Sequence, residues 1–212
     1  RVCPAARQAV LGGEDPLRDV VDLTEPAFSP DGHAIVYTAT SANRADDKSQ
    51  SDLWRVDFDG SHRVRLTNTP KFDESRPQWS PDGKSIAFLS DRGGEDADTQ
   101  VWLMPANGGE ARRLTKFGES ISDFAWSPDG KRIAFIGRDP ERPFGAKKPK
   151  QPPPIVTERY QFREDGTGYL DSRRNHVYVF DIATGKTDLL TPGAHDEQLL
   201  TWSPDGKLLA YV

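Results

Sequence analysis

The chain has 212 residues, with 33 acidic and 28 basic side chains and a formal net charge of -5 at neutral pH. This balance argues against a nucleic-acid-binding surface, which is usually basic, and no apolar run approaches the ~20 residues of a membrane-spanning helix. The single cysteine, Cys3, excludes a disulfide and a thiolate zinc site within the chain, while 18 glycines and 17 prolines indicate many turns.

The first residues of the chain stand apart from the rest. Residues 1–23 carry no repeated pattern, and we expect them to form a lead-in segment. The chain opens with Arg1 and lacks the apolar core of a signal peptide, so we expect that the true start was removed or trimmed.

A tetrapeptide, Ser-Pro-Asp-Gly, occurs four times in the remaining sequence. It begins at Ser29, Ser80, Ser127 and Ser203, and directly follows an aromatic residue each time: Phe28, Trp79, Trp126 and Trp202. A second aromatic stands nine residues after the first: Tyr37, Phe88, Phe135 and Tyr211. Ser accepts a turn hydrogen bond, Pro presets φ and Gly takes a positive φ, so each tetrapeptide predicts a β-hairpin turn. The aromatics are large and apolar, which predicts core positions, and the nearly continuous apolar second strand predicts burial on both faces.

A second pair of strands follows in each unit. Three apolar runs each contain an aromatic, and a Leu-Thr pair comes twelve residues after that aromatic: Leu53–Val56 with Leu66-Thr67, Val101–Met104 with Leu114-Thr115, and Val177–Phe180 with Leu190-Thr191. Turn signals lie between them at Asp59-Gly60, Asn107-Gly108-Gly109 and Thr184-Gly185. Successive units start 51, 47 and 76 residues apart, and four-stranded units at such spacing are typical of propeller blades.

The fold class is therefore all-β: a partial β-propeller of four-stranded antiparallel blades. We expect blades at residues 24–67, 68–115 and 116–191, and the first hairpin of a truncated fourth blade at 192–212. Because the chain ends inside the strand begun at Leu208, and three and a fraction blades cannot close a ring, we expect the parent protein to continue beyond residue 212.

Three segments interrupt the regular pattern. We expect polar loops from Thr38 to Asp52 and from Ser90 to Gln100, and an insertion at residues 137–176 in the third blade. Its first part, Asp139–Pro154, is rich in Pro and Lys and is better interpreted as a solvated linker than as a basic binding patch. The second part predicts a projecting hairpin, with a strand at Ile155–Phe162, a turn at Asp165–Gly168 and a return strand from Tyr169.

Candidate chemistry is sparse. The chain has no Gly-x-Ser-x-Gly motif, the repeated serines belong to turns, and His33, His62, His176 and His195 lack metal-ligand spacing. The acidic run at residues 95–98 is interpreted as solvated surface. We therefore expect no catalytic residue, metal site or cofactor in this chain. Five insertion residues combine charge, aromatic surface and turn geometry, and substrate contact or gating competes there with a purely structural role: Arg159, Tyr160, Arg163, Asp165 and Tyr169.

The repeat resembles those of two known groups of propellers. Aromatic-Ser-Pro-Asp-Gly-Lys-x-Ile-Ala-Phe, closed by Leu-Thr, is similar to the repeat of the Tol-system periplasmic propeller and to the N-terminal propeller of the prolyl oligopeptidase family of serine peptidases. The insertion favours the second group. Arg159-Tyr160, the run from Arg163 to Leu170 and then His176–Asp181 resemble the corresponding blade of acylaminoacyl-peptidase and dipeptidyl-peptidase-like members.

The peptidase resemblance implies a two-domain serine hydrolase with its Ser-Asp-His triad in an α/β-hydrolase domain beyond residue 212. The propeller would be non-catalytic and would admit only short peptides, so its partners would be peptide substrates and its own hydrolase domain. This chain alone should be inactive. The alternative is a Tol-type binding propeller acting as a protein-interaction module. Peptide specificity, oligomeric state (a homo-oligomer included) and compartment, bacterial periplasm or cytoplasm, stay open.

Overall fold

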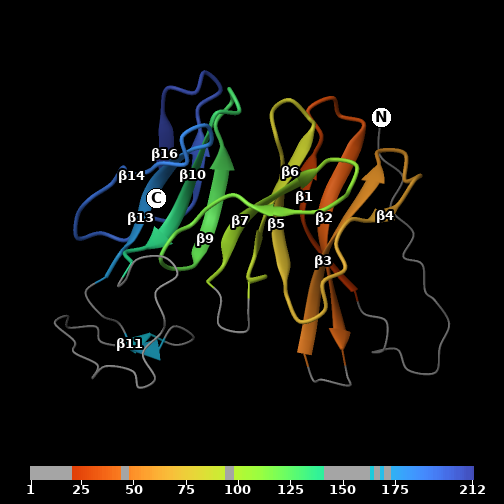
Figure 1. Ribbon diagram of the computed structural model, residues 1–212, viewed down its shortest axis with the longest axis horizontal. Helices are drawn as coiled ribbons and strands as arrows, with labels where there is room; N and C mark the ends of the chain where they lie inside the picture. Colours follow the sequence, from red (N-terminus) through yellow and green to blue (C-terminus); the bar gives the residue numbers. More distant parts are fainter. Residues whose placement is uncertain (1–20, 44–47, 94–97, 141–162, 165–167, 170–172) are drawn as a thin grey trace.

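The chain forms a row of antiparallel β-sheets. The computed structural model describes residues 21–43, 48–93, 98–140, 163–164, 168–169 and 173–212. Within these ranges the regular elements are all strands, and no helix is long and apolar enough to cross a membrane. Figure 1 shows the three large sheets side by side, with the first sheet on the right and the third on the left.

Each large sheet has four antiparallel strands, and consecutive strands are neighbours apart from the insertion. The first sheet contains β1 (Val21–Phe28), β2 (Ala34–Asn43), β3 (Lys48–Asp57) and β4 (Val64–Arg65). The second contains β5 (Glu74–Trp79), β6 (Ser85–Ser90), β7 (Gln100–Pro105) and β8 (Arg112–Arg113). The third contains β9 (Ile121–Trp126), β10 (Arg132–Arg138), β13 (Asn175–Asp181) and β14 (Thr187–Leu189). Two hairpins complete the described part, β11 (Arg163–Glu164) with β12 (Gly168–Tyr169), and β15 (Leu200–Trp202) with β16 (Leu209–Tyr211).

The Ser-Pro-Asp-Gly tetrapeptides form the turns between the first two strands of each sheet and of the last hairpin, as predicted. All four glycines have positive φ, between 68° and 72°: Gly32, Gly83, Gly130 and Gly206. Each glycine N–H donates to the carbonyl of the turn serine at 2.8–2.9 Å. The repeated tetrapeptide therefore fixes where each hairpin reverses, and the open, propeller-like arrangement of blades predicted from the repeat is confirmed.

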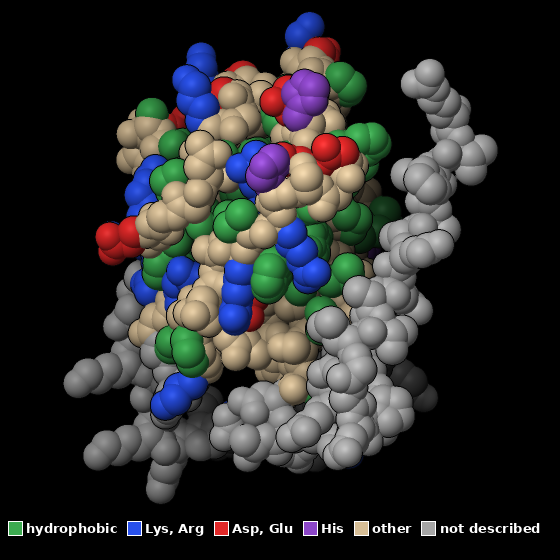
Figure 2. Space-filling model, turned by 90° about the vertical axis from the view of Figure 1, so that its right-hand side faces the viewer, with side chains coloured by type: hydrophobic (Ala, Val, Ile, Leu, Met, Phe, Trp, Pro, Cys, Tyr) green, Lys and Arg blue, Asp and Glu red, His purple; other side chains and the backbone are tan. Residues whose placement is uncertain are grey.

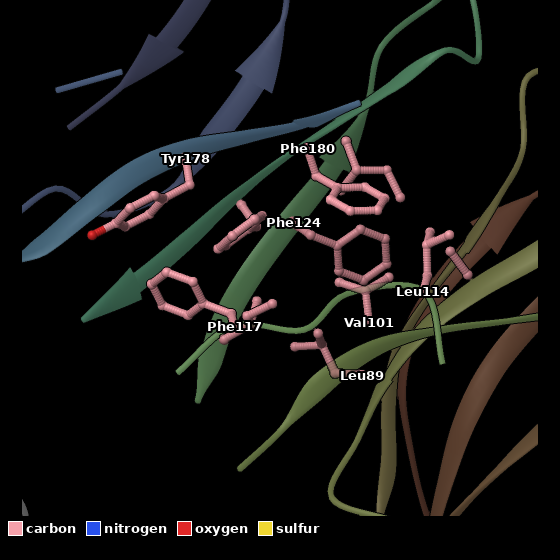
Figure 3. Packing of buried hydrophobic residues seen from close by; sticks show 11 residues of the cluster. Leu89, Val101, Leu114, Phe117, Phe124, Tyr178 and Phe180 are labelled. Atoms are coloured by element: carbon pink, nitrogen blue, oxygen red, sulfur yellow. The ribbon is translucent and has the colours of Figure 1, made fainter. Parts of the chain in front are cut away.

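The hydrophobic core lies between the sheets rather than within one of them. Between the second and third sheets, side chains from β6, β7, β9, β10, β13 and the segment before β9 converge, and Figure 3 shows Phe117, Phe124, Tyr178 and Phe180 among them. Between the first and second sheets, Val36, Leu53, Ile86, Phe88 and Met104 form a second cluster. The middle strands β6 and β10 are buried along almost their whole length, which confirms the prediction of strands covered on both faces.

Two expectations from the sequence are wrong in part. The segment 38–52 is not a loop throughout, because β2 runs on to Asn43 and β3 begins at Lys48, with paired polar residues such as Thr40 and Ser51. The repeated aromatics are not all in the core: Phe88 and Phe135 are fully buried, but Phe28 is 58% and Tyr211 47% exposed. These two lie on the first sheet and the last hairpin, where within the described residues only one side has a neighbouring sheet.

The outward side of the first sheet carries several exposed apolar side chains. They are Val21, Leu23, Phe28 and Phe58. The rings of Phe28 and Phe58 lie 6.1 Å apart. Figure 2, which looks onto this side, shows hydrophobic side chains spread between charged ones.

Candidate functional site

The hydroxyl of each turn serine is used in hydrogen bonds within its own turn. Ser29 Oγ accepts the N–H of Ala34 at 2.9 Å and donates to Asp31 Oδ1 at 2.6 Å. The other three turns repeat both bonds at corresponding positions: Ser80 with Ser85 and Asp82, Ser127 with Arg132 and Asp129, and Ser203 with Leu208 and Asp205. The serine hydroxyl is the main reason why the pKa of each turn aspartate lies below its ordinary value.

The five insertion residues singled out from the sequence are only partly described. Arg159, Tyr160 and Asp165 lie outside the described residues, as does the expected strand at 155–162. Arg163 and Tyr169 are paired across the β11–β12 hairpin, and the Arg163 side chain is exposed. The structure therefore brings two of the five together and places a hairpin around the expected turn.

The insertion leaves β10 and returns to β13 at the same end of the third sheet. We call this end of the sheets the insertion face. At this end β2 meets β3, β6 meets β7, and β10 meets β13. Figure 1 shows this end at the bottom, with β11 at the lower left. The two longest connections between strands of one sheet, the insertion and the β6–β7 connection, thus emerge on the same face, whereas the Ser-Pro-Asp-Gly turns lie on the opposite one.

Ion pairs and backbone bonds hold the two ends of the insertion. The Asp139 N–H donates to the Arg174 carbonyl at 2.8 Å, which joins the segment after β10 to the segment before β13. Arg173 pairs with Glu119 at 2.9 Å, and Arg174 pairs with Asp196 at 3.0 Å. Glu119 precedes β9 and Asp196 precedes β15, so the insertion is fixed both to its own blade and to the start of the next one.

His176 lies at the centre of this joint. Its Nδ1 is 2.9 Å from Glu197 Oε2 and its Nε2 is 3.5 Å from Asp139 Oδ2, and the side chain is 3% exposed. The Tyr178 hydroxyl donates to Asp139 Oδ1 at 2.9 Å. Burial, together with this bond to a carboxylate, raises the pKa of Tyr178, so the phenol remains a hydrogen-bond donor.

Sequence reasoning missed this cluster, because it considered the four histidines only as metal ligands. A signal was present: aligning the repeats places His176 two residues before Tyr178, just as Asp52 precedes Trp54 and Gln100 precedes Trp102. All three residues are buried. A polar residue at the same buried position of every blade indicates a joint that requires hydrogen-bond partners.

A second cluster of charged residues lies on β1, β5 and β9, the first strands of the three large sheets. β1 contacts β5, and β5 contacts β9. Glu25 Oε2 accepts the Arg76 N–H at 2.6 Å, and Arg76 Nη1 is 2.8 Å from Asp123 Oδ1. Glu25 and Arg76 have φ values of 54° and 51°, and Leu199 occupies the same repeat position with 48°. Positive φ values of this size strain a residue other than glycine. The bonds between neighbouring sheets hold Glu25 and Arg76 in this conformation.

A groove of about 420 Å³ lies between the first two Ser-Pro-Asp-Gly turns. Its charged groups are paired locally: Arg55 with Asp57 at 3.5 Å, and Lys84 with Asp82 at 4.0 Å. In the described part of the chain, no three or more His, Cys, Asp or Glu side chains are placed to hold a metal ion. The hydrogen bonds and ion pairs described above join neighbouring segments of the chain.

Comparison with known proteins decides the family. Residues 20–150 match the family described as the TolB beta propeller domain. The chain belongs to the TolB β-propeller domain family. This assignment agrees with the four-stranded sheets and with the repeat resemblance.

The relatives of this TolB-family propeller bear peptidase names, as the insertion motif predicted. The chain is 31% identical over 201 residues to the uncharacterized peptidase YuxL of Bacillus subtilis, covering 93% of this chain and 30% of that protein. It is 40% identical over 72 residues to dipeptidyl-peptidase 5 of Porphyromonas gingivalis, covering 34% of this chain and 10% of that protein. The chain thus spans less than a third of the length of these relatives.

A solved structure supports the fold. The uncomplexed acylaminoacyl peptidase of Pyrococcus horikoshii matches with a TM-score of 0.64 at 19% identity, over 92% of this chain and 28% of that chain. At this identity the likeness concerns the fold alone.

Proposed function

We propose that this propeller is the non-catalytic domain that limits substrate access to the active site of a serine peptidase acting on short peptides. The similarity to YuxL carries the proposal: it extends over nearly the whole propeller but over less than a third of a protein named a peptidase. The remaining length of such a protein has room for an α/β-hydrolase domain. The substrates are acylated or dipeptidyl-type peptides, by analogy with the names of the relatives.

The insertion face fits the side that meets the substrate. The long connections emerge there, and ion pairs fix the ends of the insertion to two blades. Loops on a rigid repeat scaffold often carry binding. In this proposal Arg159, Tyr160, Arg163, Asp165 and Tyr169 contact the peptide, while bond cleavage depends on a serine outside this chain.

An active-site-directed fluorophosphonate, together with chromogenic acylaminoacyl and dipeptidyl substrates, tests the proposal. The full gene product that contains this chain should be labelled and should hydrolyse at least one substrate class, whereas residues 1–212 alone should do neither. Absence of labelling and hydrolysis in the full product would overturn the peptidase assignment. In the active product, Arg163→Ala should raise KM with little change in kcat, with Arg112→Ala, on β8 away from the insertion face, as the control.

The second candidate is a Tol-type binding propeller, which the family match over residues 20–150 favours. It predicts a gene product without hydrolase activity that forms a stable complex with another protein. Labelling by the fluorophosphonate therefore separates the two candidates directly.

A further inference from the structure

One buried position is occupied by three different chemical groups in the three sheets. Asp52, Gln100 and His176 each precede a residue whose backbone N–H donates to a threonine hydroxyl. The bonds are Leu53 to Thr67 at 2.9 Å, Val101 to Thr115 at 3.0 Å and Val177 to Thr191 at 2.9 Å. The backbone bond is thus the same in each blade, and the buried side chain that precedes it differs.

At the corresponding positions of the first two sheets, Asp52 and Gln100 form their contacts without a histidine. Asp52 is paired with Arg65 at 2.6 Å. Gln100 is uncharged and forms four hydrogen bonds. Its side-chain amide donates to the Phe117 and Glu119 carbonyls and accepts the Phe117 N–H and the Thr115 hydroxyl. A neutral glutamine therefore suffices to join the second blade to the third.

The third joint presents a carboxylate to each nitrogen of the His176 ring, at 2.9 Å and 3.5 Å. A neutral imidazole has one N–H, so one of its nitrogens would face a carboxylate oxygen with a lone pair. Only the imidazolium presents an N–H to each carboxylate, donating to Glu197 at 2.9 Å and lying 3.5 Å from Asp139 as an ion pair. Because the side chain is 3% exposed, water has little room to substitute for the missing proton.

In the described part of the chain, neighbouring charged and titratable groups have other partners. Arg174 is held by Asp196, Arg173 by Glu119, and the Tyr178 hydroxyl binds Asp139. His176 is therefore the group that bridges Asp139 and Glu197. Histidine is also the side chain that ordinarily changes its charge between about pH 5 and pH 8.

The bridged carboxylates belong to different segments. Asp139 follows β10, whereas Glu197 precedes β15, and the Glu197 N–H donates to the Asn175 carbonyl at 2.9 Å. Gln198 and Val212 exchange backbone bonds at 2.6 and 2.8 Å, which ties this segment to the end of the β15–β16 hairpin. A neutral His176 can still donate Nδ1–H to Glu197, but the bond loses the charge of the imidazolium. Because charge-assisted hydrogen bonds are roughly twice as strong as neutral ones, loss of the proton weakens the contact between the third sheet and that hairpin.

We propose that His176 is a proton-operated latch, which holds the β15–β16 hairpin against the third sheet when the imidazole is protonated and releases it more often when it is not. The latch is specific to this joint, because the corresponding positions carry Asp52 and Gln100. It is independent of the proposed peptidase activity.

Hydrogen exchange of the β15–β16 amides at pH 5.5 and pH 8.0, corrected for intrinsic rates, tests the latch in the protein as it exists. We expect protection to fall about tenfold at pH 8.0, the size of effect expected when a hydrogen bond to a charged group is weakened. His176→Gln places the side chain of Gln100 at this joint and should remove the pH dependence. His195→Gln replaces an exposed histidine and should retain it.

Equal corrected protection at the two pH values would overturn the proposal. So would the same pH dependence in His176→Gln as in the unmodified protein, or an equal change across β5–β8. Glu197→Gln provides a second variant should His176→Gln not fold. It removes one of the two carboxylates and should reduce the pH dependence, and an unchanged dependence there also counts against the latch.

Discussion

Phe117 lies so close to Gly137 that a Cβ on the glycine would be 2.5 Å from Phe117 Cε1. The ring cannot easily move away. It packs edge-on against Phe135, with centroids 5.1 Å apart, and against Tyr178 at 4.6 Å. The segment before β9 is thereby fixed against β10, close to where the insertion begins.

Gly137→Ala should therefore destabilise the protein by about 1–3 kcal/mol, the usual cost of overpacking a core. Urea unfolding measures the effect. In a Phe117→Ala background the same substitution should cost much less, because the ring that the new methyl group meets is gone. Additive effects of the two substitutions would contradict this explanation.

The buried hydroxyl of Thr115 should contribute more than its size suggests. It accepts the Val101 N–H and donates to Gln100 Oε1, both at 3.0 Å. Thr115→Val keeps the shape but leaves the buried Val101 N–H without its acceptor and removes one of the two donors to Gln100 Oε1, with an expected loss of about 1–3 kcal/mol. Thr115→Ser retains the hydroxyl and should lose less in the same unfolding measurement. Equal losses would mean that packing, not hydrogen bonding, explains the threonine.

The turn serines should differ in importance according to burial. Ser29 Oγ accepts the N–H of buried Ala34, whereas Ser203 makes the equivalent bond to Leu208 at an exposed site. Ser29→Ala should cost about 1–2 kcal/mol, because a buried N–H loses its acceptor, and Ser203→Ala should cost clearly less, because water can replace the hydroxyl. Thermal unfolding of the two variants provides the comparison, and a larger loss for Ser203→Ala would contradict it.

The sequence was informative about the fold because its signals are local. Gly32, Gly83 and Gly130 take the positive φ that their turns require, and any residue with a side chain would be strained there. The run Ile133–Phe135 identified a strand buried on both faces because alternation was absent. These features depend on residues a few positions apart, so no tertiary information was needed.

The joints between blades could not be predicted in the same way. Glu25, Arg76 and Asp123 come together only because β1, β5 and β9 adjoin, and these residues are separated by about fifty positions in the chain. Likewise, the contact of His176 with Asp139 spans the whole insertion. The exposure of Phe28 was unpredictable for a related reason, since burial depends on which sheet faces a residue and not on its place in the repeat.

The buried carboxyl of Glu74 should give the protein a measurable pH dependence. Glu74 is fully buried, and Arg92 lies 2.6 Å from its Oε1. Burial raises its pKa above the ordinary value of 4.5, although Arg92 opposes the shift. The folded state therefore binds this proton more tightly than the unfolded state. The resulting contribution to stability is present below about pH 4.5 and is lost as the pH rises through the raised pKa.

Relative to Glu74→Gln, the unmodified protein should thus lose stability from about pH 4.5 upwards, by at most about 1.4 kcal/mol per pH unit. Urea unfolding of both proteins at several pH values between 4.5 and 7.5 gives the difference. Glu110→Gln, which removes an exposed carboxylate, controls for the change in net charge. If the unmodified protein instead gains stability over Glu74→Gln with rising pH, the ion pair with Arg92 outweighs burial and the direction argued here is wrong.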